Sequence, residues 1–354
     1  MVTGAPPDGL DHPRSRRPAR FLALCVIAGA GLTLAGCGGS VASGAPAGSV
    51  AYVANVAGLA DPGDTLTLVD TAASKSVGTI TTGSLPAAMA ATPDGADLLV
   101  ADKGINRLSD ISVSTGKSVG QAAVGLEPDA VAVTPDGSLA LVANFGANTV
   151  TPIALPSMKV GSPIPVGRQP VAVAISLSGK VAVVANYEDG TVTLIGLPAL
   201  TPLAAVPAGT EPDAVVISAD SHTALVADFE TSTVTPIDLV HMNAGNAIPV
   251  AGNPTGIALW KTSSVAYVSG GDNVTPVDLP HLNAGAPLSV GTTAEALALS
   301  DNGLTAWVCG GNGTLVSLKL ASGAIGAKVA VGGQPTAVVI PAPPNIGTST
   351  GVGS

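Results

Sequence analysis

Two pairs of residues that suit proton transfer or metal binding recur at one spacing, forty residues apart. The stretch TPIDLVHMNAG places Asp238 three residues before His241, and the stretch TPVDLPHLNAG places Asp278 three residues before His281. Carboxylates and imidazoles are common metal ligands, and such a pair can also move a proton. The recurrence has two interpretations: a duplicated site, or a structural repeat copied along the chain.

A repeated unit of about 42 residues accounts for most of the chain. One strand-like motif occurs seven times, as YVAN, LVAD, LVAN, VVAN, LVAD, YVSG and WVCG at positions 52, 99, 141, 183, 225, 267 and 307. Each unit holds four short β-like runs with turn residues between them; over 169–208 these are QPVAVAIS, KVAVVAN, GTVTLIGL and LAAVPA. Four strands per repeat of this length are typical of a β-propeller blade. The sequence therefore predicts an all-β, seven-bladed β-propeller.

The order of the runs predicts how the ring closes. The repeats begin with a second-strand motif, SVAYVAN at 49–55, and end with a first-strand motif, QPTAVVI at 334–340. We expect this C-terminal strand to complete the blade begun by the N-terminal strand, which leaves no exposed sheet edge.

The combined pattern of [YLV]-V-A-N, T-V-T-x-I-D-L and V-G-x-x-P-x-A-V-A-x-x-P-D-G resembles the YVTN family of β-propeller repeats over residues 50–341. The resemblance implies the propeller fold, while its functional implications are broad. Members include bacterial surface and exported proteins, and the fold is shared with lactonases and cofactor-bearing oxidoreductases. The chain departs from the family in the third strands, where Thr-Pro occurs at Pro152, Pro236 and Pro276. Because proline cannot donate to a ladder, we expect a bulge or a broken ladder at these positions.

The N-terminal 36 residues are interpreted as a bacterial lipoprotein signal peptide. RSRRPAR at 14–20 is basic, and FLALCVIAGAGLTLAG at 21–36 is an apolar run too short for a membrane-spanning helix. The tetrapeptide LAGC, which ends at Cys37, resembles a lipobox; the alternative is a cysteine that follows a signal peptide by chance. We expect lipidation of Cys37, a flexible tether over 37–49, and a location on the outer side of the cell membrane.

Composition and motifs exclude several classes of function. The chain has a net charge of −10 and 2% aromatic residues, which does not suit a nucleic-acid binder. No G-x-S-x-G nucleophile motif and no C-x-x-C-H haem motif are present. Cys309 occupies, in WVCGG, a slot that holds alanine in other repeats, so we expect it to be a small buried residue.

The predicted ligand site is the mouth of the central channel on the upper face, where the chain enters each first strand. Polar residues flank the repeated proline there: Glu127, Asp129, Gln169, Glu211, Asp213, Glu295 and Gln334. The carboxylates among them could attract a cation or hold Ca²⁺. The alternative is that they are ordinary turn residues, and that the Asn or Asp after each second strand closes its own turn. We predict no dedicated metal site and place any ligand at this mouth.

These features favour a non-enzymatic function. We expect an exported, lipid-anchored monomer that acts as a binding scaffold at the cell envelope, for a protein or a small cationic ligand, with a disordered tail over 342–354. The alternative is a lactonase-like hydrolase that uses a metal held by the carboxylates of the mouth.

The repeat also explains the two Asp/His pairs. Both fall between a third and a fourth strand, on the lower face, and two of the seven repeats carry both residues. With strands about 4.8 Å apart, adjacent blades place the two histidines about 15 Å from each other, too far to share one metal. We therefore interpret the pairs as copies of a repeat.

Overall fold

The computed structural model describes residues 50–56, 64–260 and 263–341. The predicted signal peptide, Cys37, the tether and the C-terminal tail lie outside these residues. The described chain is built of strands and turns, with one short 3-10 helix, η1 (Lys103–Ile105). No helix in this part of the chain has the length and hydrophobicity needed to cross a membrane.

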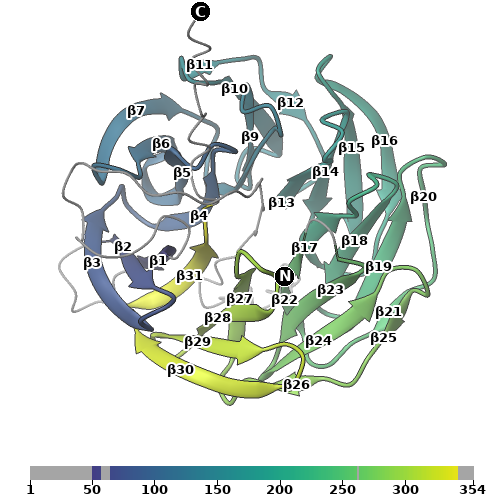
Figure 1. Ribbon diagram of the computed structural model, residues 1–354. Coiled ribbons are helices and arrows are strands. Elements are labelled where there is room, and N and C mark those ends of the chain that lie inside the picture. Colours follow the sequence, from purple (N-terminus) through teal and green to yellow (C-terminus); the bar gives the residue numbers. More distant parts are fainter. Residues whose placement is uncertain (1–49, 57–63, 261–262, 342–354) are drawn as a thin grey trace, which may run out of the picture.

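Seven antiparallel sheets surround a central axis as the blades of a propeller (Figure 1). In blade 1 the strands run outward as β31 (Gln334–Val339), β1 (Val50–Val56), β2 (Thr65–Asp70) and β3 (Lys75–Thr81). Blade 2 has β4 (Pro86–Ala91), β5 (Asp97–Asp102), β6 (Arg107–Ser112) and β7 (Lys117–Ala123). Blade 4 has β13 (Pro170–Ile175), β14 (Val181–Asn186), β15 (Thr191–Gly196) and β16 (Thr201–Pro207). Blade 7 has β27 (Ala294–Leu299), β28 (Thr305–Gly310), β29 (Thr314–Lys319) and β30 (Ala324–Ala330).

The outermost strand is split into two short pieces in the other three blades. Blade 3 has β8 (Pro128–Val133), β9 (Leu139–Asn144) and β10 (Thr149–Ala154), then β11 (Lys159–Val160) and β12 (Ile164–Pro165). Blade 5 has β17 (Pro212–Ile217), β18 (Thr223–Asp228) and β19 (Thr233–Asp238), then β20 (Asn243–Ala244) and β21 (Ile248–Pro249). Blade 6 has β22 (Pro254–Leu259), β23 (Val265–Gly270) and β24 (Asn273–Asp278), then β25 (Asn283–Ala284) and β26 (Leu288–Ser289).

The ring closes as the sequence predicts. The C-terminal strand β31 pairs antiparallel with the N-terminal strand β1, with Val338 opposite Val53 and Val339 opposite Tyr52. In Figure 1 the yellow strand β31 lies beside the purple strand β1. One blade therefore contains both ends of the repeat region. The innermost strand of every blade contacts the innermost strands of the two adjacent blades.

The core consists of small and β-branched residues. The second strands are almost entirely buried: Ala140, Leu141, Val142 and Ala143 of β9 are each 0% exposed. Both faces of such a strand are covered because adjacent blades pack face to face, so its residues are apolar on both sides instead of alternating. Alanine and valine occupy little space and allow the sheets to pack closely, which explains a core with few aromatic residues.

The three proline-containing third strands belong to the three blades with split outer strands. In blade 3 the inner ladder is intact, with Pro152 opposite Leu141, while the Pro152 carbonyl accepts a hydrogen bond from the Gly161 N–H at 2.8 Å on the outer side. The N–H that proline lacks would have faced the same way as its carbonyl. The predicted break in the ladder is confirmed, and it affects only the outermost strand.

Candidate binding site on the upper face

The upper face is formed by two sets of connections: those between an outermost strand and the next innermost strand, and those between second and third strands. The predicted mouth residues all lie here, at or just before the first residues of β8, β13, β17, β27 and β31. Their surroundings differ: Glu127 and Gln334 are exposed, Gln169, Glu211 and Glu295 are half-buried, and Asp129 and Asp213 are buried. The repeat places these residues on one face but does not make them equivalent.

Asp129 is engaged in a contact between blades. Lys103 of blade 2 approaches it with its Nζ 3.0 Å from Oδ1, and the same ammonium lies 4.6 Å from the centre of the Phe145 ring. Asp129 is 3% exposed; this burial raises the pKa of its carboxyl, and the positive charge of Lys103 opposes the rise. The partly buried ammonium therefore neutralises a buried carboxylate, since a charge removed from water needs a close partner.

Threonine performs a similar linking role at the same position of other blades. The Thr255 hydroxyl donates to the carbonyl of Ala294 at 2.9 Å, and the Thr336 hydroxyl donates to the carbonyl of Pro86 at 2.9 Å. Both bonds join innermost strands of neighbouring blades. The position after the repeated proline thus serves contacts between blades at Asp129, Thr255 and Thr336. Within the described residues no three His, Cys, Asp or Glu side chains are arranged to hold a metal ion.

The Asn or Asp at or next to the end of five second strands closes its own turn, as the alternative interpretation predicts for these residues. Asn144 and Asp228 are both 0% exposed. The Asn144 amide donates to the Thr151 hydroxyl at 2.8 Å, and the Asp228 carboxylate accepts from the Thr235 hydroxyl at 2.6 Å. Asn55, Asp102 and Asn186 make corresponding bonds to Thr67, Ser109 and Thr193. These polar groups point into the blades and contribute no ligand-binding surface.

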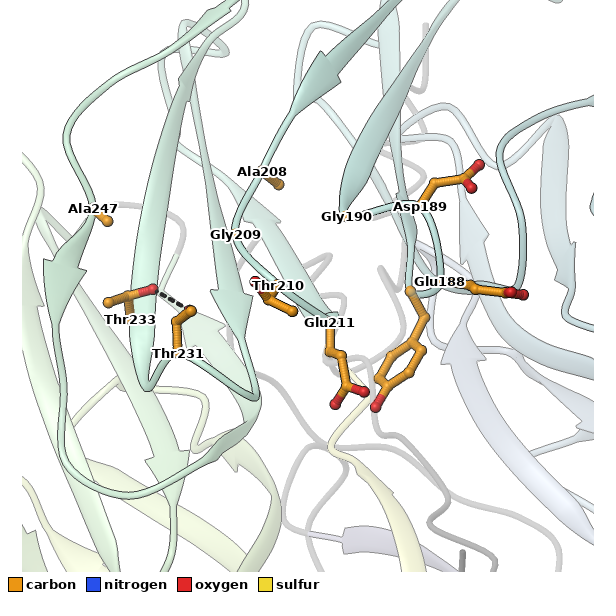
Figure 2. Close-up of a pocket in the computed structure, with 11 residues that line it drawn as sticks. Glu188, Asp189, Gly190, Ala208, Gly209, Thr210, Glu211, Thr231, Thr233 and Ala247 are labelled. Carbon is orange, nitrogen blue, oxygen red and sulfur yellow. Dashed lines mark hydrogen bonds between the residues drawn. The ribbon is translucent and has the colours of Figure 1, made fainter. Parts of the chain in front are cut away.

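A cavity of about 650 Å³ opens on the upper face between blades 4 and 5 (Figure 2). Blade 4 contributes the β14–β15 turn with Glu188 and Asp189, and the β16–β17 connection adds Thr210 and Glu211. Blade 5 contributes the β18–β19 turn with Thr231 and Thr233, whose hydroxyls are 2.8 Å apart. The lining is therefore rich in carboxylates and hydroxyls.

Two small residues, Gly209 and Ala247, form part of the cavity wall. The Gly209 N–H donates to the Asp228 carboxylate at 3.0 Å, and a Cβ added at Gly209 would lie 2.3 Å from the Asp228 Cγ. Glycine is thus required where the loop crosses the buried carboxylate. Ala247, on the other wall, lies between β20 and β21, in the segment that Pro236 prevents from pairing as a continuous strand.

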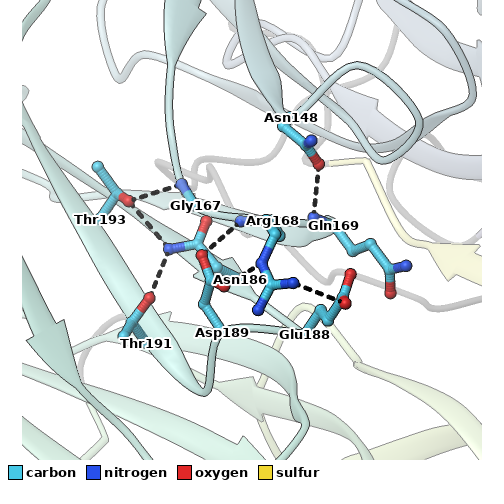
Figure 3. Close-up of polar contacts among 9 residues, drawn as sticks. All are labelled: Asn148, Gly167, Arg168, Gln169, Asn186, Glu188, Asp189, Thr191 and Thr193. Carbon is cyan, nitrogen blue, oxygen red and sulfur yellow. Dashed lines mark hydrogen bonds and ion pairs between the residues drawn. The ribbon is translucent and has the colours of Figure 1, made fainter.

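An arginine beside the cavity holds two of its carboxylates (Figure 3). The Arg168 guanidinium lies 2.6 Å from Asp189 and 2.9 Å from Glu188, and the Arg168 backbone N–H also donates to Asp189. This backbone bond and the guanidinium lower the pKa of Asp189. The next residue, Gln169, is held by its backbone N–H, which donates to the Asn148 side chain at 2.8 Å. The network fixes the β14–β15 turn in place.

The charge balance of the cavity favours a cation. Glu188, Asp189 and Glu211 line it, whereas the guanidinium of Arg168 is beside it and not part of the lining. Carboxylates and threonine hydroxyls accept hydrogen bonds from an ammonium or guanidinium group, and such charge-assisted bonds are stronger than neutral ones. This arrangement can bind a small organic cation or a basic side chain.

Sequence reasoning found part of this site. Glu211 is among the predicted mouth residues, whereas Glu188 and Asp189 fall among the turn residues between the β-like runs KVAVVAN and GTVTLIGL and are not predicted to bind a ligand. Two adjacent carboxylates in a turn of the upper face were the available signal. That this turn and the β18–β19 turn enclose one cavity depends on the packing of two blades, which no local motif encodes.

The two Asp/His pairs are local turn structures on the lower face. His241 Nδ1 lies 2.8 Å from the Asp238 carboxylate, and His281 Nδ1 lies 2.6 Å from that of Asp278. Asp238 also accepts the backbone N–H of His241, and these bonds lower its pKa to about 2. Each histidine is thus bound to the aspartate of its own turn, as expected for a copied repeat.

Cys309 is fully buried, as its alanine-like slot predicts. Burial raises the pKa of its thiol, so the thiolate needed for nucleophilic attack is disfavoured.

Comparison with known proteins supports the fold alone. No protein-family model matches this chain, and no curated protein sequence matches it. Kuenenia stuttgartiensis hydrazine synthase is similar in structure, with a TM-score of 0.66, 20% identity, and coverage of 73% of this chain and 90% of the other. A functionally unknown protein from Desulfotomaculum acetoxidans gives a TM-score of 0.74 at 16% identity, over 83% and 99% of the two chains. Dihydro-heme d1 dehydrogenase NirN, solved in complex with DHE, gives a TM-score of 0.62 at 14% identity, over 84% and 76%.

Proposed function

We propose that this chain is an exported, lipid-anchored β-propeller that acts as a non-enzymatic binding scaffold at the cell envelope, with a cationic ligand or basic partner bound on its upper face. The observation that carries the proposal is the cavity between blades 4 and 5, lined by Glu188, Asp189 and Glu211. The closed ring of seven sheets holds these loops in fixed positions. Binding by the loops leaves the pairing of the strands unchanged.

The cellular part of the proposal rests on the N-terminal sequence. A basic segment, a short apolar run and the LAGC tetrapeptide precede the first described strand, β1. Their order suits export followed by lipidation of Cys37, and the Gly/Ala/Ser-rich residues after it suit a flexible connection to the propeller. The motif resemblance to YVTN repeats, whose members include exported proteins, supports the same assignment.

The alternative, a metal-dependent hydrolase, has less support. Of the carboxylates expected to hold its metal, Asp129 is ion-paired to Lys103, and no three ligands converge in the described part of the chain. Hydrazine synthase and the NirN dehydrogenase show that this fold also occurs in enzymes, but their sequence identity carries no activity over to this chain.

The test is a calorimetric titration of the purified protein with agmatine and with a lysine-rich peptide at low ionic strength. We expect binding that weakens as salt is added, because the cavity is open to solvent. Glu211→Gln should weaken it about tenfold, the equivalent of roughly 1.4 kcal/mol.

Glu230→Gln is the matched control. Glu230 is an exposed carboxylate in the β18–β19 turn and does not line the cavity, so this variant changes the net charge equally and should keep most of the affinity. Absence of binding to both probes, or equal losses in the two variants, contradicts the proposal. Tight Ca²⁺ binding with an EDTA-sensitive melting temperature would favour the hydrolase instead.

A further inference from the structure

The chain enters and leaves the propeller on one face. The lower face holds the connections opposite to those of the upper face: first to second strand, and third to outermost strand. The first residue of β1, Val50, pairs with Asp70 at the lower end of β2. The innermost strand β31 descends from Gln334, which pairs with Val56 at the upper end of β1, and ends at Val339 near the lower face. Any segment joined to either end therefore departs from the lower face.

Exposed apolar side chains gather at the tips of lower-face turns. Val240 and Met242 lie in the β19–β20 turn and are 60% and 39% exposed, and Leu282, in the β24–β25 turn of the next blade, is 41% exposed. Leu177 and Leu304, at the lower turns of blades 4 and 7, are 45% and 62% exposed. The apolar tips thus occupy blades 4 to 7, and blade 7 adjoins the blade in which the chain enters. The upper-face connections carry two such exposed apolar residues, Ile105 and Leu126, at 43% and 58% exposed.

Charge distinguishes the two faces further. The lower face and its rim carry the exposed lysines Lys75, Lys117, Lys159, Lys180 and Lys319, together with every histidine of the described residues. The lower face also carries carboxylates: Asp94, Asp136 and Asp220 accept hydrogen bonds in their own turns, which lower their pKa and keep them ionised, and Asp238 and Asp278 are paired to histidines.

The upper face has fewer basic groups: Lys103, Arg107, Arg168, and Lys328 toward the upper end of β30. Lys103 is ion-paired to Asp129, and Arg168 is ion-paired to Glu188 and Asp189. Glu127, Glu211, Glu230 and Glu295 also lie on this face. An anionic bilayer therefore repels the upper face more strongly than it repels the lower face.

We propose that the lower face is the membrane-facing surface of the protein, with the tips of blades 4 to 7 resting on the bilayer and the upper cavity turned away from it. This inference rests on the proposed lipid anchor at Cys37. Cys37 precedes Val50 by thirteen residues, and a flexible chain of that length spans about 20 Å on average. Strands of six residues are about 20 Å tall, so the tether is short relative to the height of the domain plus its loops. The lower face is the one that meets the membrane at the smallest cost in tether extension.

The experiment compares two fluorophore positions on the full lipidated protein in vesicles of 70% phosphatidylcholine and 30% phosphatidylglycerol. A single engineered cysteine is labelled either at a lower tip, Val240→Cys, or on the upper face, Leu126→Cys. These side chains are equally exposed, at 60% and 58%, and Cys309 is too buried to take the label. Quenching by doxyl-labelled lipid should be several-fold stronger at 240 than at 126.

The outcomes separate orientation from anchoring. The mass of the N-terminal peptide shows whether Cys37 carries lipid. If it does, and quenching is equal at both positions or stronger at 126, the proposed orientation is wrong and the anchor stands. Absence of lipid on Cys37 together with failure to float with vesicles overturns the anchor, and the orientation with it. Cation binding by the upper cavity is measured separately in detergent, so the scaffold proposal stands or falls on its own result.

Discussion

At the scale of single residues, the repeat uses asparagine and aspartate interchangeably in one buried position, with different consequences. Asn144 donates to a threonine hydroxyl and Asp228 accepts from one, and of the two only the carboxylate can ionise. Burial is the main cause that raises the pKa of Asp102 and of Asp228 to about 6. Because these groups hold a proton more tightly in the folded state than in the unfolded state, where a carboxyl titrates near pH 3.9, the native state loses stability as pH rises from about 4 through about 6.

Asp228→Asn and Asp102→Asn should therefore stabilise the protein at neutral pH. Each substitution removes the cost of ionising a buried carboxyl, which is up to about 3 kcal/mol for a pKa difference of two units. The new amide can donate to the neighbouring hydroxyl, as the Asn144 amide donates to Thr151. Urea unfolding at pH 4.5 and pH 7.5 should show a smaller loss of stability between the two values in the variants than in the parent. Asp136→Asn, at an exposed turn aspartate whose pKa is lowered by hydrogen bonds, is the control and should leave that loss in place. An unchanged pH dependence in the double variant contradicts this explanation.

At the scale of elements, three prolines decide the form of the outer strands. Blade 4 has a seven-residue outer strand, β16, that pairs continuously apart from one register shift, with Leu194 opposite Ala204. Blade 5 has a segment of the same length over 243–249, but Pro236 stands at the position of Leu194 and the middle pairs are missing. The absent N–H is the physical difference between the two.

Pro236→Val should restore the middle of this strand. The Gly245 N–H already donates to the Pro236 carbonyl. A second bond, from the new N–H to a carbonyl between β20 and β21, should hold this segment on β19, so local opening becomes rarer and amide exchange over 245–247 should slow by an order of magnitude or more. Hydrogen exchange followed by mass spectrometry measures this directly. Pro152→Val, in blade 3, should slow exchange only in its own blade, and it should leave cation binding intact because Ala247 of blade 5, not blade 3, lines the cavity. Equal exchange in parent and variant at 245–247 would show that another constraint holds the strand open.

At the scale of the whole molecule, stability depends on a seam between the two ends of the propeller. Strand β31 pairs with β1, the Thr336 hydroxyl donates to Pro86 of blade 2, and the Thr67 hydroxyl donates to Val331. Without β31, the edge of β1 and the apolar faces of its neighbours would be open to water and to other chains.

A chain that ends at Gly333 should therefore lose its cooperative unfolding and sediment as oligomers or aggregates. A chain that ends at Pro341 is the control: it keeps β31 and removes only residues outside the described structure, so its melting temperature should match that of the parent. Analytical ultracentrifugation and thermal melts distinguish the two. A cooperative monomeric product from the shorter chain would contradict the role of the seam.

The sequence by itself determined the architecture, because each repeat buries its apolar faces only against its neighbours and seven copies can satisfy one another in a closed ring. It also determined the turn role of Asn144 and its equivalents, the break at the prolines, and the burial of Cys309, since these follow from local chemistry in a known register. The tertiary structure alone decided which polar residues are available to a ligand. Asp129 and Glu211 stand next to the same repeated proline, yet one is buried against Lys103 of a neighbouring blade and the other lines a cavity. That difference arises from side chains meeting across blade boundaries, where the packing of adjacent sheets, and not the repeat pattern, sets the distances.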